Sequence, residues 1–358
     1  MYRLAPIFLL IITTLTSCSS NGIDDISIPE QESTIYFPPT SSNVWETKTI
    51  SDLGWNQNNL QALLDFLENN NTKSFIILHD GKIVVEEYMN GHDADKIWYW
   101  ASAGKTLTTT LAGIAQHEEL LNLNDKVFEY LGTGWTSASV EKESIISCKH
   151  LLTMTTGIDD SLGDNVAPEN LQYKADAGSR WAYHNIYKKM QDVISTASGF
   201  SFTEYFNTKL KNKIGMNGVW LEPNYHNVYW SNARSMARFG LFIYAKGKWN
   251  DLQIVPETFI TEATTSSQDM NQAYGYLWWL NGQNSFMLPG SQLNFDGKLI
   301  PNAPNDLFAA LGKNDQKIYI VPSKNIAVIR MGEKANTEAL ALSSFDNQLW
   351  EKINALIN

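Results

Sequence analysis

The spacing of apolar residues along the chain predicts strands near both ends and helices between them. Residues 74–79 and 82–88 are apolar, β-branched runs joined by Asp80-Gly81, a dipeptide typical of tight hairpin turns. From about residue 123 to 262, apolar residues recur every three or four positions, which is typical of helices with one buried face. Strand patterns then return in four segments, at residues 275–280, 306–311, 317–321 and 326–331.

Helical patterns precede, interrupt and follow these strands, at residues 55–68, 150–155, 186–198, 202–211, 231–245 and 336–357. Strands that stop for a long helical stretch and then resume indicate a single sheet with an insertion. The pattern therefore predicts an α/β (α+β) fold, in which an antiparallel sheet is flanked by helices. A mainly helical lobe is expected to be inserted at about residues 123–262.

One further helical pattern begins near Ser102, and Lys105 follows one helical turn later. A serine hydroxyl beside a lysine amine suits acyl transfer, and the positive end of a helix favours developing negative charge. The alternative is that Ser102 only caps the helix, which is a common role for serine. The same spacing recurs at Ser139 and Lys142, but that copy lies in a polar segment and is expected on the surface.

Other chemistries fit the sequence poorly. Gly104-Lys105-Thr106 resembles the end of a phosphate-binding loop, but Tyr99 stands where that loop needs its first glycine. His117-Glu118 begins a zinc-binding pattern that Leu121 does not complete. The formal net charge is −11 and there is no basic stripe, which disfavours nucleic acid as a partner. We therefore expect no cofactor and no metal.

The N-terminus has the pattern of an export signal. Arg3 precedes a short apolar run, and residues 15–18 (Leu-Thr-Ser-Cys) resemble a bacterial lipobox. This predicts a signal peptide at 1–17, lipidation of Cys18, a flexible tether at 18–44 and one domain at 45–358. The chain would then be an exported lipoprotein, anchored to a membrane and facing the periplasm or the cell surface. The alternative is an ordinary signal peptide with a chance cysteine; the other cysteine, Cys148, has apolar neighbours and is expected to be buried.

A second motif lies about eighty residues after Ser102. Tyr183-His184-Asn185 follows Gly178 and opens an apolar helix at Ile186. With this pair of motifs the chain resembles the serine β-lactamase and penicillin-binding-protein superfamily. The likeness is to the class C β-lactamases, the related esterases and the nylon-oligomer hydrolases. Supporting segments at residues 150–157, 235–240 and 318–322 extend the resemblance over about residues 45–358.

The resemblance implies a serine β-lactamase-like fold and a role for each matching residue. Ser102 would be the acylated nucleophile, and Lys105 would be the general base or would hold Tyr183 partly ionised. Tyr183 would pass a proton to the leaving group, and Asn185 would hydrogen-bond Lys105 or the substrate amide. Without the resemblance, Tyr183 and Asn185 would be taken for a core aromatic and a helix cap.

The family's third motif, a Lys-Thr-Gly or His-x-Gly on the strand facing the serine, is altered here. One register places Ala310-Leu311-Gly312 on it, with no cation at the first position, and makes the Lys313 backbone N–H an oxyanion donor. The other register begins at Lys313 and loses the glycine. We favour the first, because the backbone must approach the substrate closely there. Either register alters the usual clamp for a β-lactam carboxylate.

The aromatic pair Trp278-Trp279 lies on an expected strand, so the two rings face opposite sides and Trp279 is a candidate pocket residue. Together these features predict a metal-free serine hydrolase that cleaves small ester or amide substrates through an acyl-serine intermediate. One alternative is a D-amino-acid peptidase or β-lactamase. The other is a non-catalytic cell-wall or ligand-binding protein on the same fold.

Overall fold

The computed structural model of the chain describes residues 35–222, 227–335, 342 and 344–358. The expected signal peptide, Cys18 and most of the expected tether lie outside the described residues. So do residues 336–341 and 343, at the start of the expected last helix. None of the described helices is both long and apolar enough to cross a membrane.

The folded body begins at Ile35, ten residues before the expected start of the domain at residue 45. The Phe37 ring packs against Trp249, with ring centroids 5.2 Å apart. The guanidinium of Arg238 donates hydrogen bonds to the carbonyl oxygens of Pro38 and Pro39. The expectation that the tether extends to residue 44 is therefore wrong, because a buried aromatic and a buried cation hold this polar segment on the domain.

A six-stranded sheet forms the centre of the domain, in the order β2-β1-β13-β12-β11-β8, and every pairing in it is antiparallel. The expected antiparallel sheet is thus confirmed. The strands are β1 (Thr72–His79), β2 (Lys82–Tyr88), β8 (Trp279–Leu280), β11 (Phe308–Gly312), β12 (Gln316–Val321) and β13 (Ile326–Gly332). The β8 strand is shorter than expected, because Leu277 adopts a positive φ of 60° and breaks the extended backbone.

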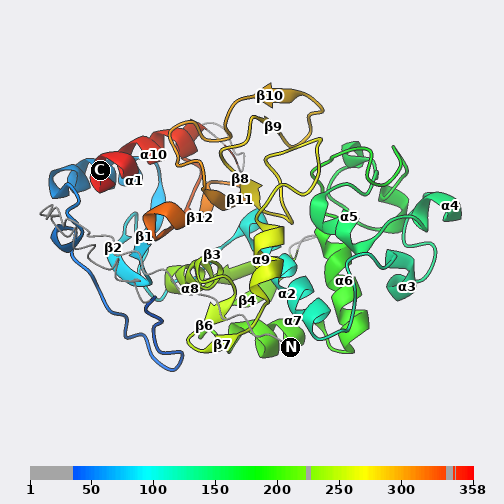
Figure 1. Cartoon of the computed structure of the whole chain (residues 1–358), viewed down its shortest axis with the longest axis horizontal. Coiled ribbons are helices and arrows are strands. Elements are labelled where there is room, and N and C mark those ends of the chain that lie inside the picture. The colour runs from blue at the N-terminus through cyan, green and yellow to red at the C-terminus, as the bar shows by residue number, and fades with distance from the viewer. Residues whose placement is uncertain (1–34, 223–226, 336–341, 343) are drawn as a thin grey trace, which may run out of the picture. The chain divides into compact units, whose positions relative to one another are not determined.

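Helices cover the two faces of this sheet. Gly240 on α8 (Ala233–Tyr244) lies against Ile318 and Ile329, which pair across β12 and β13. The next residues along those strands, Tyr319 and Arg330, point the other way, and their side chains contact α10 (Ser344–Ile357) through Trp350 and Phe345. The helix α1 (Leu60–Asn69) packs beside α10 on that second face, as Figure 1 shows.

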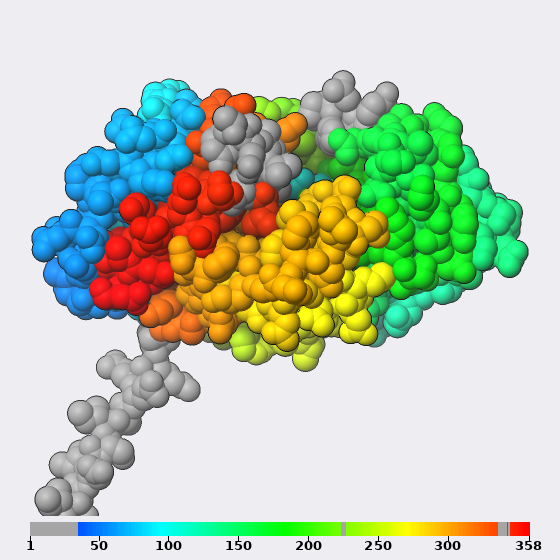
Figure 2. Space-filling view, turned by 90° about the horizontal axis from the view of Figure 1, so that it is seen from above, coloured from blue at the N-terminus to red at the C-terminus, as the bar shows by residue number. Residues whose placement is uncertain are grey.

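A group of helices forms a lobe at one end of the domain (Figures 1 and 2). Its members are α3 (Val127–Leu131), α4 (Val140–Glu143), α5 (Cys148–Thr153), α6 (Tyr187–Ser198) and α7 (Phe202–Phe206), which continues into a π-helical turn at Asn207–Lys211. The α6 helix contacts α2 (Lys105–His117), which runs between the lobe and the sheet and also contacts α9 (Glu257–Ala263). Although α8 falls inside the expected insertion of 123–262, its apolar face packs on the sheet and not on this lobe.

Three small sheets complete the part of the fold that the structure describes. They are β3 (Trp98–Tyr99) with β5 (Val228–Ser231) and β4 (Val219–Leu221), β6 (Lys248–Trp249) with β7 (Leu252–Gln253), and β9 (Ser285–Met287) with β10 (Asn294–Asp296). The β3 strand leads directly to Ser102, and the hairpin of β9 and β10 follows β8 in the chain. Both therefore place loops around the region where the sheet meets the helical lobe.

Candidate active site

Ser102 lies in a short 3₁₀ turn (Ala101–Gly104), and Lys105 is the first residue of α2. Ala101 enters this turn with a positive φ of 47°, an uncommon conformation for a residue with a side chain. No side-chain hydrogen bond caps the turn or the helix, so the cap alternative for Ser102 is wrong. The Nζ of Lys105 instead donates a hydrogen bond to the Oγ of Ser102, over 2.7 Å.

The Lys105 amine is enclosed by aromatic rings, and the residue as a whole is buried. Its Nζ lies 4.9 Å from the ring centroid of Tyr183 and 4.7 Å from that of Tyr187. Cation–π contacts of this kind hold an amine in place without neutralising it. These contacts therefore fix the Lys105 amine beside Ser102.

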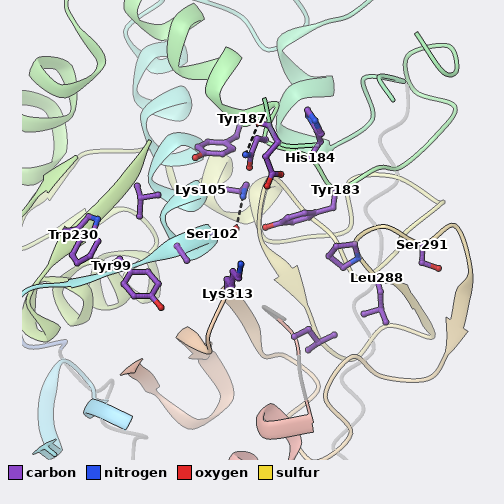
Figure 3. Close-up of a pocket in the computed structure, with 16 residues that line it drawn as sticks. Tyr99, Ser102, Lys105, Tyr183, His184, Tyr187, Trp230, Leu288, Ser291 and Lys313 are labelled. Atoms are coloured by element: carbon purple, nitrogen blue, oxygen red, sulfur yellow. Dashed lines mark hydrogen bonds between the residues drawn. The ribbon is translucent and has the colours of Figure 1, made fainter. Parts of the chain in front are cut away.

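These residues open onto a cavity of about 720 Å³. Ser102, Lys105, Tyr183, Asn185 and Lys313 all line it, so the structure brings together five of the residues selected from the sequence. The other described lining residues are Tyr99, Ala101, Asp164, His184, Tyr187, Val228, Trp230, Leu288, Pro289, Ser291 and Leu342. Figure 3 shows the Tyr183 hydroxyl pointing toward Ser102.

Trp279 does not line the cavity, which corrects the expectation that it is a pocket residue. Its side chain is buried, and its ring stacks on Tyr183 with centroids 5.8 Å apart and planes 27° from parallel. Trp278 packs on the other side, against Phe239 and Phe308. The two tryptophans thus face opposite sides as expected. The Trp279 ring packs against the Tyr183 ring and is not part of the cavity lining.

Tyr187 was not selected from the sequence, although it is the first residue of α6, the helix that follows the Tyr183 motif. Its hydroxyl donates to the Asn227 carbonyl oxygen, and burial raises the pKa of this phenol well above its usual range. Asn227 also donates to Gln191 on α6, and Gln191 donates to Thr108 on α2. This chain of bonds aligns the helix that begins with Lys105 against the helix that follows Tyr183.

Asn185 and His184 hold a neighbouring loop. The side chain of Asn185 donates to the carbonyl oxygen of Asp164, and Nε2 of His184 lies 2.8 Å from the carbonyl oxygen of Gly163. His184 itself is buried. Burial lowers the pKa of His184 below its usual value. The Tyr183-His184-Asn185 motif therefore contributes a cavity wall and also anchors the loop that carries Asp164.

The end of β11 approaches the Ser102 turn closely. Gly312 does not line the cavity, but a Cβ there would collide with the Trp100 carbonyl oxygen and lie 3.1 Å from the Ala103 nitrogen. This contact supports the register in which Gly312 occupies the glycine position of the third motif. Lys313, the next residue, does line the cavity with its side chain exposed.

Three other residues considered in the sequence do not line the cavity: Ser139, Lys142 and Cys148. Ser139 is exposed and caps α4, while Lys142 forms an ion pair with Asp176 over 2.6 Å. Cys148 is buried as expected, and burial raises the pKa of its thiol to about 12, so it stays protonated. In the part of the chain that the structure describes, no three His, Cys, Asp or Glu side chains are grouped to hold a metal ion.

A family model described as beta-lactamase matches residues 70–347, which include the whole central sheet, Ser102 and Tyr183. The chain belongs to the beta-lactamase family. The resemblance inferred from the two motifs is thus confirmed, and so is the expected fold class. Membership in the beta-lactamase family establishes a hydrolase fold and leaves the substrate open, since one fold hosts many activities.

Solved structures with the beta-lactamase fold agree with this assignment. A protein from Bacillus anthracis, named as a candidate 6-aminohexanoate-dimer hydrolase, is 18% identical with a TM-score of 0.67. The match covers 89% of this chain and 88% of that one. A penicillin-binding protein from Bacillus halodurans is 14% identical with a TM-score of 0.61, covering 82% and 99%. EstCE1, a hydrolase with promiscuous acyltransferase activity, is 12% identical with a TM-score of 0.63, covering 86% and 99%. At such identities the likeness concerns the fold alone, and none of the curated proteins matches the chain.

Proposed function

We propose that this protein is a serine hydrolase that cleaves small esters or amides through an acyl-serine intermediate. The observation that carries the proposal is the 2.7 Å contact between Lys105 Nζ and Ser102 Oγ, in a cavity that Tyr183 also lines. A weak nucleophile within hydrogen-bonding distance of a base, with a second proton carrier nearby, is the arrangement that acyl transfer requires.

In the first half of the proposed reaction, Lys105, acting alone or through Tyr183, removes the proton from Ser102 as the Oγ attacks the substrate carbonyl carbon. Negative charge then develops on the carbonyl oxygen. The backbone N–H groups of Ser102 and Lys313 are the proposed donors to it, and the contact of Gly312 with the Ser102 turn supports this placement. Tyr183 returns the proton to the departing alcohol or amine, and the acyl group remains on Ser102.

In the second half, water attacks the acyl-serine. The same pair, Lys105 and Tyr183, accepts a proton from the water and returns one to Ser102 Oγ as the acid leaves. The enclosure of the Lys105 amine by two aromatic rings supports this reuse, because the amine keeps one position through both halves. Tyr187 is an unsuitable proton carrier, because burial raises the pKa of its hydroxyl and holds it protonated.

Active-site labelling tests this proposal directly. The purified protein is treated with a fluorophosphonate probe, and the tagged peptide is identified by mass spectrometry. We expect the phosphonyl group on Ser102. Ser139 is a matched internal control, because it has the same Ser-x-x-Lys spacing but caps a surface helix. A protein that remains unlabelled, or that carries the tag elsewhere, contradicts the proposal and favours a non-catalytic binding protein on this fold.

A D-amino-acid peptidase or β-lactamase remains the second candidate function. The observation that favours it is the presence of a lysine, Lys313, in the cavity, because both substrate classes carry a carboxylate. The two candidate functions are compared by measuring the turnover of nitrocefin and of a p-nitrophenyl ester on one preparation.

A further inference from the structure

Tyr183 is one of four aromatic residues whose rings all contact one another. The other three are Trp181, Tyr274 and Trp279, and the distances between ring centroids range from 5.0 to 6.3 Å. Of the four, Tyr183 alone lines the cavity, whereas the other three side chains are buried. The ring of the candidate proton carrier is therefore held from behind by an aromatic cluster in which every ring supports every other.

A tight turn places Tyr274 beside Trp279. The two residues are antiparallel partners at the two ends of this turn, so their side chains lie next to each other on one side of it. The turn is also fixed from outside, because the backbone N–H of Tyr276 donates a hydrogen bond to the carbonyl oxygen of Ala263 over 2.9 Å. Packing therefore fixes the Tyr274 ring relative to Tyr183, and only the hydroxyl hydrogen can rotate.

Packing does not explain the hydroxyl of Tyr274. This hydroxyl is buried and has no hydrogen-bond partner among the described residues. The other buried tyrosines in the described part of the chain all donate to an oxygen acceptor; they are Tyr187, Tyr205, Tyr229, Tyr276 and Tyr319. A hydroxyl that is buried without a partner lowers stability, and a phenylalanine ring would fill the same space without this penalty. The tyrosine at position 274 therefore indicates a role beyond packing.

The phenols of Tyr274 and Tyr183 interact electrostatically. Burial, and after it the negative charge that Tyr183 carries when ionised, raises the pKa of Tyr274 well above its usual range. Tyr274 therefore keeps its proton when Tyr183 loses one. A neutral O–H group without another acceptor can turn its positive end toward a phenolate, and this interaction is strong in a buried site because the local dielectric constant is low.

We propose that Tyr274 is a positioning residue whose hydroxyl stabilises the ionised form of Tyr183 during proton transfer. The proposal rests on the hydrolase function proposed above and adds a residue that acts on the reaction without touching the substrate. The proton moves from Ser102 Oγ to the ionised oxygen of Tyr183 and then to the leaving group, while Tyr274 keeps its own proton throughout. Stabilising the ionised form increases the share of molecules that are ready to react near neutral pH.

Other ionisable groups also surround Tyr183. Lys105, at the start of α2, places its amine 4.9 Å from the Tyr183 ring centroid, and Tyr187, at the start of α6, contacts the same amine. The other ionisable residues of the described cavity wall are Tyr99, Asp164, His184 and Lys313. All of them are unchanged in a variant of Tyr274, so a comparison with wild type isolates the effect of one hydroxyl.

The variant Tyr274→Phe removes this hydroxyl and keeps the ring. The acid limb of the pH profile of kcat/KM for p-nitrophenyl butyrate should move by about half to one pH unit toward higher pH, because less Tyr183 is ionised at each pH. On that limb kcat/KM should therefore fall about three- to tenfold, and the difference from wild type should shrink as the pH rises. The melting temperature should not fall, because the variant loses a buried hydroxyl that has no partner.

Tyr276→Phe is the matched control. Tyr276 is also buried and lies two residues farther along the same turn, but its hydroxyl donates to Glu262 and its ring contacts Phe259. This variant should have a lower melting temperature and the pH profile of wild type. An unchanged acid limb in Tyr274→Phe, or an equal shift in both variants, overturns the proposal for Tyr274 alone. Absence of ester turnover in wild type instead overturns the hydrolase function.

A titration of the phenols keeps the proposal for Tyr274 testable without turnover. The ultraviolet absorbance of phenolate is followed against pH in wild type and in Tyr183→Phe, and the difference gives the titration of Tyr183. The same difference is measured between Tyr274→Phe and the double variant that combines both substitutions. The midpoint for Tyr183 should lie about half to one pH unit higher when Tyr274 is replaced. Equal midpoints in the two backgrounds rule out an effect of the Tyr274 hydroxyl on Tyr183.

Discussion

Gly312 and Trp100 are in contact through their backbones: a Cβ on Gly312 would collide with the carbonyl oxygen of Trp100. Trp100 immediately precedes the turn that holds Ser102, and Gly312 ends the β11 strand. This single contact sets the separation between the candidate nucleophile and the strand that faces it. Any side chain at position 312 must push the two apart.

Gly312→Ala is therefore expected to impair activity more than stability. Overpacking of a buried contact typically costs about 1–3 kcal/mol, and a small displacement of the strand end removes a donor from the developing oxyanion. We expect kcat for p-nitrophenyl butyrate to fall by about a hundredfold or more, with a measurable drop in the free energy of unfolding. Gly104→Ala is the control, because a Cβ there meets no atom closer than 3.7 Å. Equal effects of the two substitutions would argue against a steric role for Gly312.

Ser102→Ala is expected to lower esterase activity by at least a thousandfold, because removal of a nucleophile leaves only binding and oxyanion stabilisation. Ser139→Ala changes the other Ser-x-x-Lys copy and should retain wild-type rates, since Ser139 only caps α4 at the surface. Initial rates on p-nitrophenyl butyrate provide the measurement. Residual activity above a tenth of wild type in Ser102→Ala would show that another residue is the nucleophile.

Tyr183→Phe keeps the ring that stacks on Trp279 and removes only the hydroxyl. A general acid–base residue contributes about 10²–10⁴ in rate, so kcat should fall within that range while the melting temperature changes little. Tyr187→Phe provides the comparison. It removes the hydrogen bond to Asn227, at a cost of about 1 kcal/mol in stability, and should lower kcat much less. A reversed order of the two effects would assign proton transfer to Tyr187.

His184 makes the stability of the protein depend on pH. Burial lowers the pKa of the folded imidazole below the ordinary value of 6.5, so the unfolded chain takes up a proton first as the solution becomes acidic. The stabilisation from neutral His184 is present above about pH 6.5 and is lost as the pH falls toward the folded-state pKa. His184→Gln keeps a donor for the Gly163 carbonyl and cannot be protonated.

Urea unfolding at pH 5, 6 and 7 measures this contribution. The free energy of unfolding should fall less steeply with acidification in His184→Gln than in wild type, while the exposed His117→Gln variant keeps the wild-type slope. Burial also lowers the pKa values of His79, His92 and His150, so part of the slope should remain in every variant. Identical slopes in all three proteins would show that His184 does not contribute to the pH dependence of the free energy of unfolding.

Cys18 is proposed to carry the lipid anchor of an exported lipoprotein. The support is the lipobox-like sequence at residues 15–18, followed by a polar stretch. Cys18→Ala should move the protein from the membrane fraction to the soluble fraction of its host, because several acyl chains are needed for stable attachment. Membrane fractionation with an antibody to the folded domain measures the shift. An unchanged distribution would exclude lipidation as the means of attachment.

Within the candidate site, contacts between residues close in sequence could be predicted from local patterns, whereas the packing of distant segments could not. Ser102 and Lys105 are three residues apart at the start of a helix, so local geometry brings them together. The wall formed by Leu288 and Ser291 depends on the hairpin of β9 and β10, whose position relative to Ser102 no local pattern encodes. Alternation showed that Trp278 and Trp279 face opposite sides, but the packing of Trp279 behind Tyr183 depends on contacts between distant segments.

Composition is a poor guide to structure where a few side-chain contacts fix a whole segment. Residues 35–43 are rich in proline, serine and threonine, a composition typical of a linker. Contacts of Phe37 with Trp249, and of Arg238 with two proline carbonyls, suffice to fix this segment. Arg238 belongs to α8, far along the chain, and its role could not be inferred from residues 35–43 alone.

The strand order of the central sheet has a consequence for how the protein is made. The first hairpin, β1 with β2, pairs with β13, the last strand of the chain, and the Lys317–Asp346 ion pair needs the final helix. During synthesis, the β1 edge of the early hairpin therefore has no partner strand until nearly the whole polypeptide has left the ribosome. Contacts between such distant segments slow folding. Ser102 therefore gains the opposite wall of its cavity only after translation is almost complete.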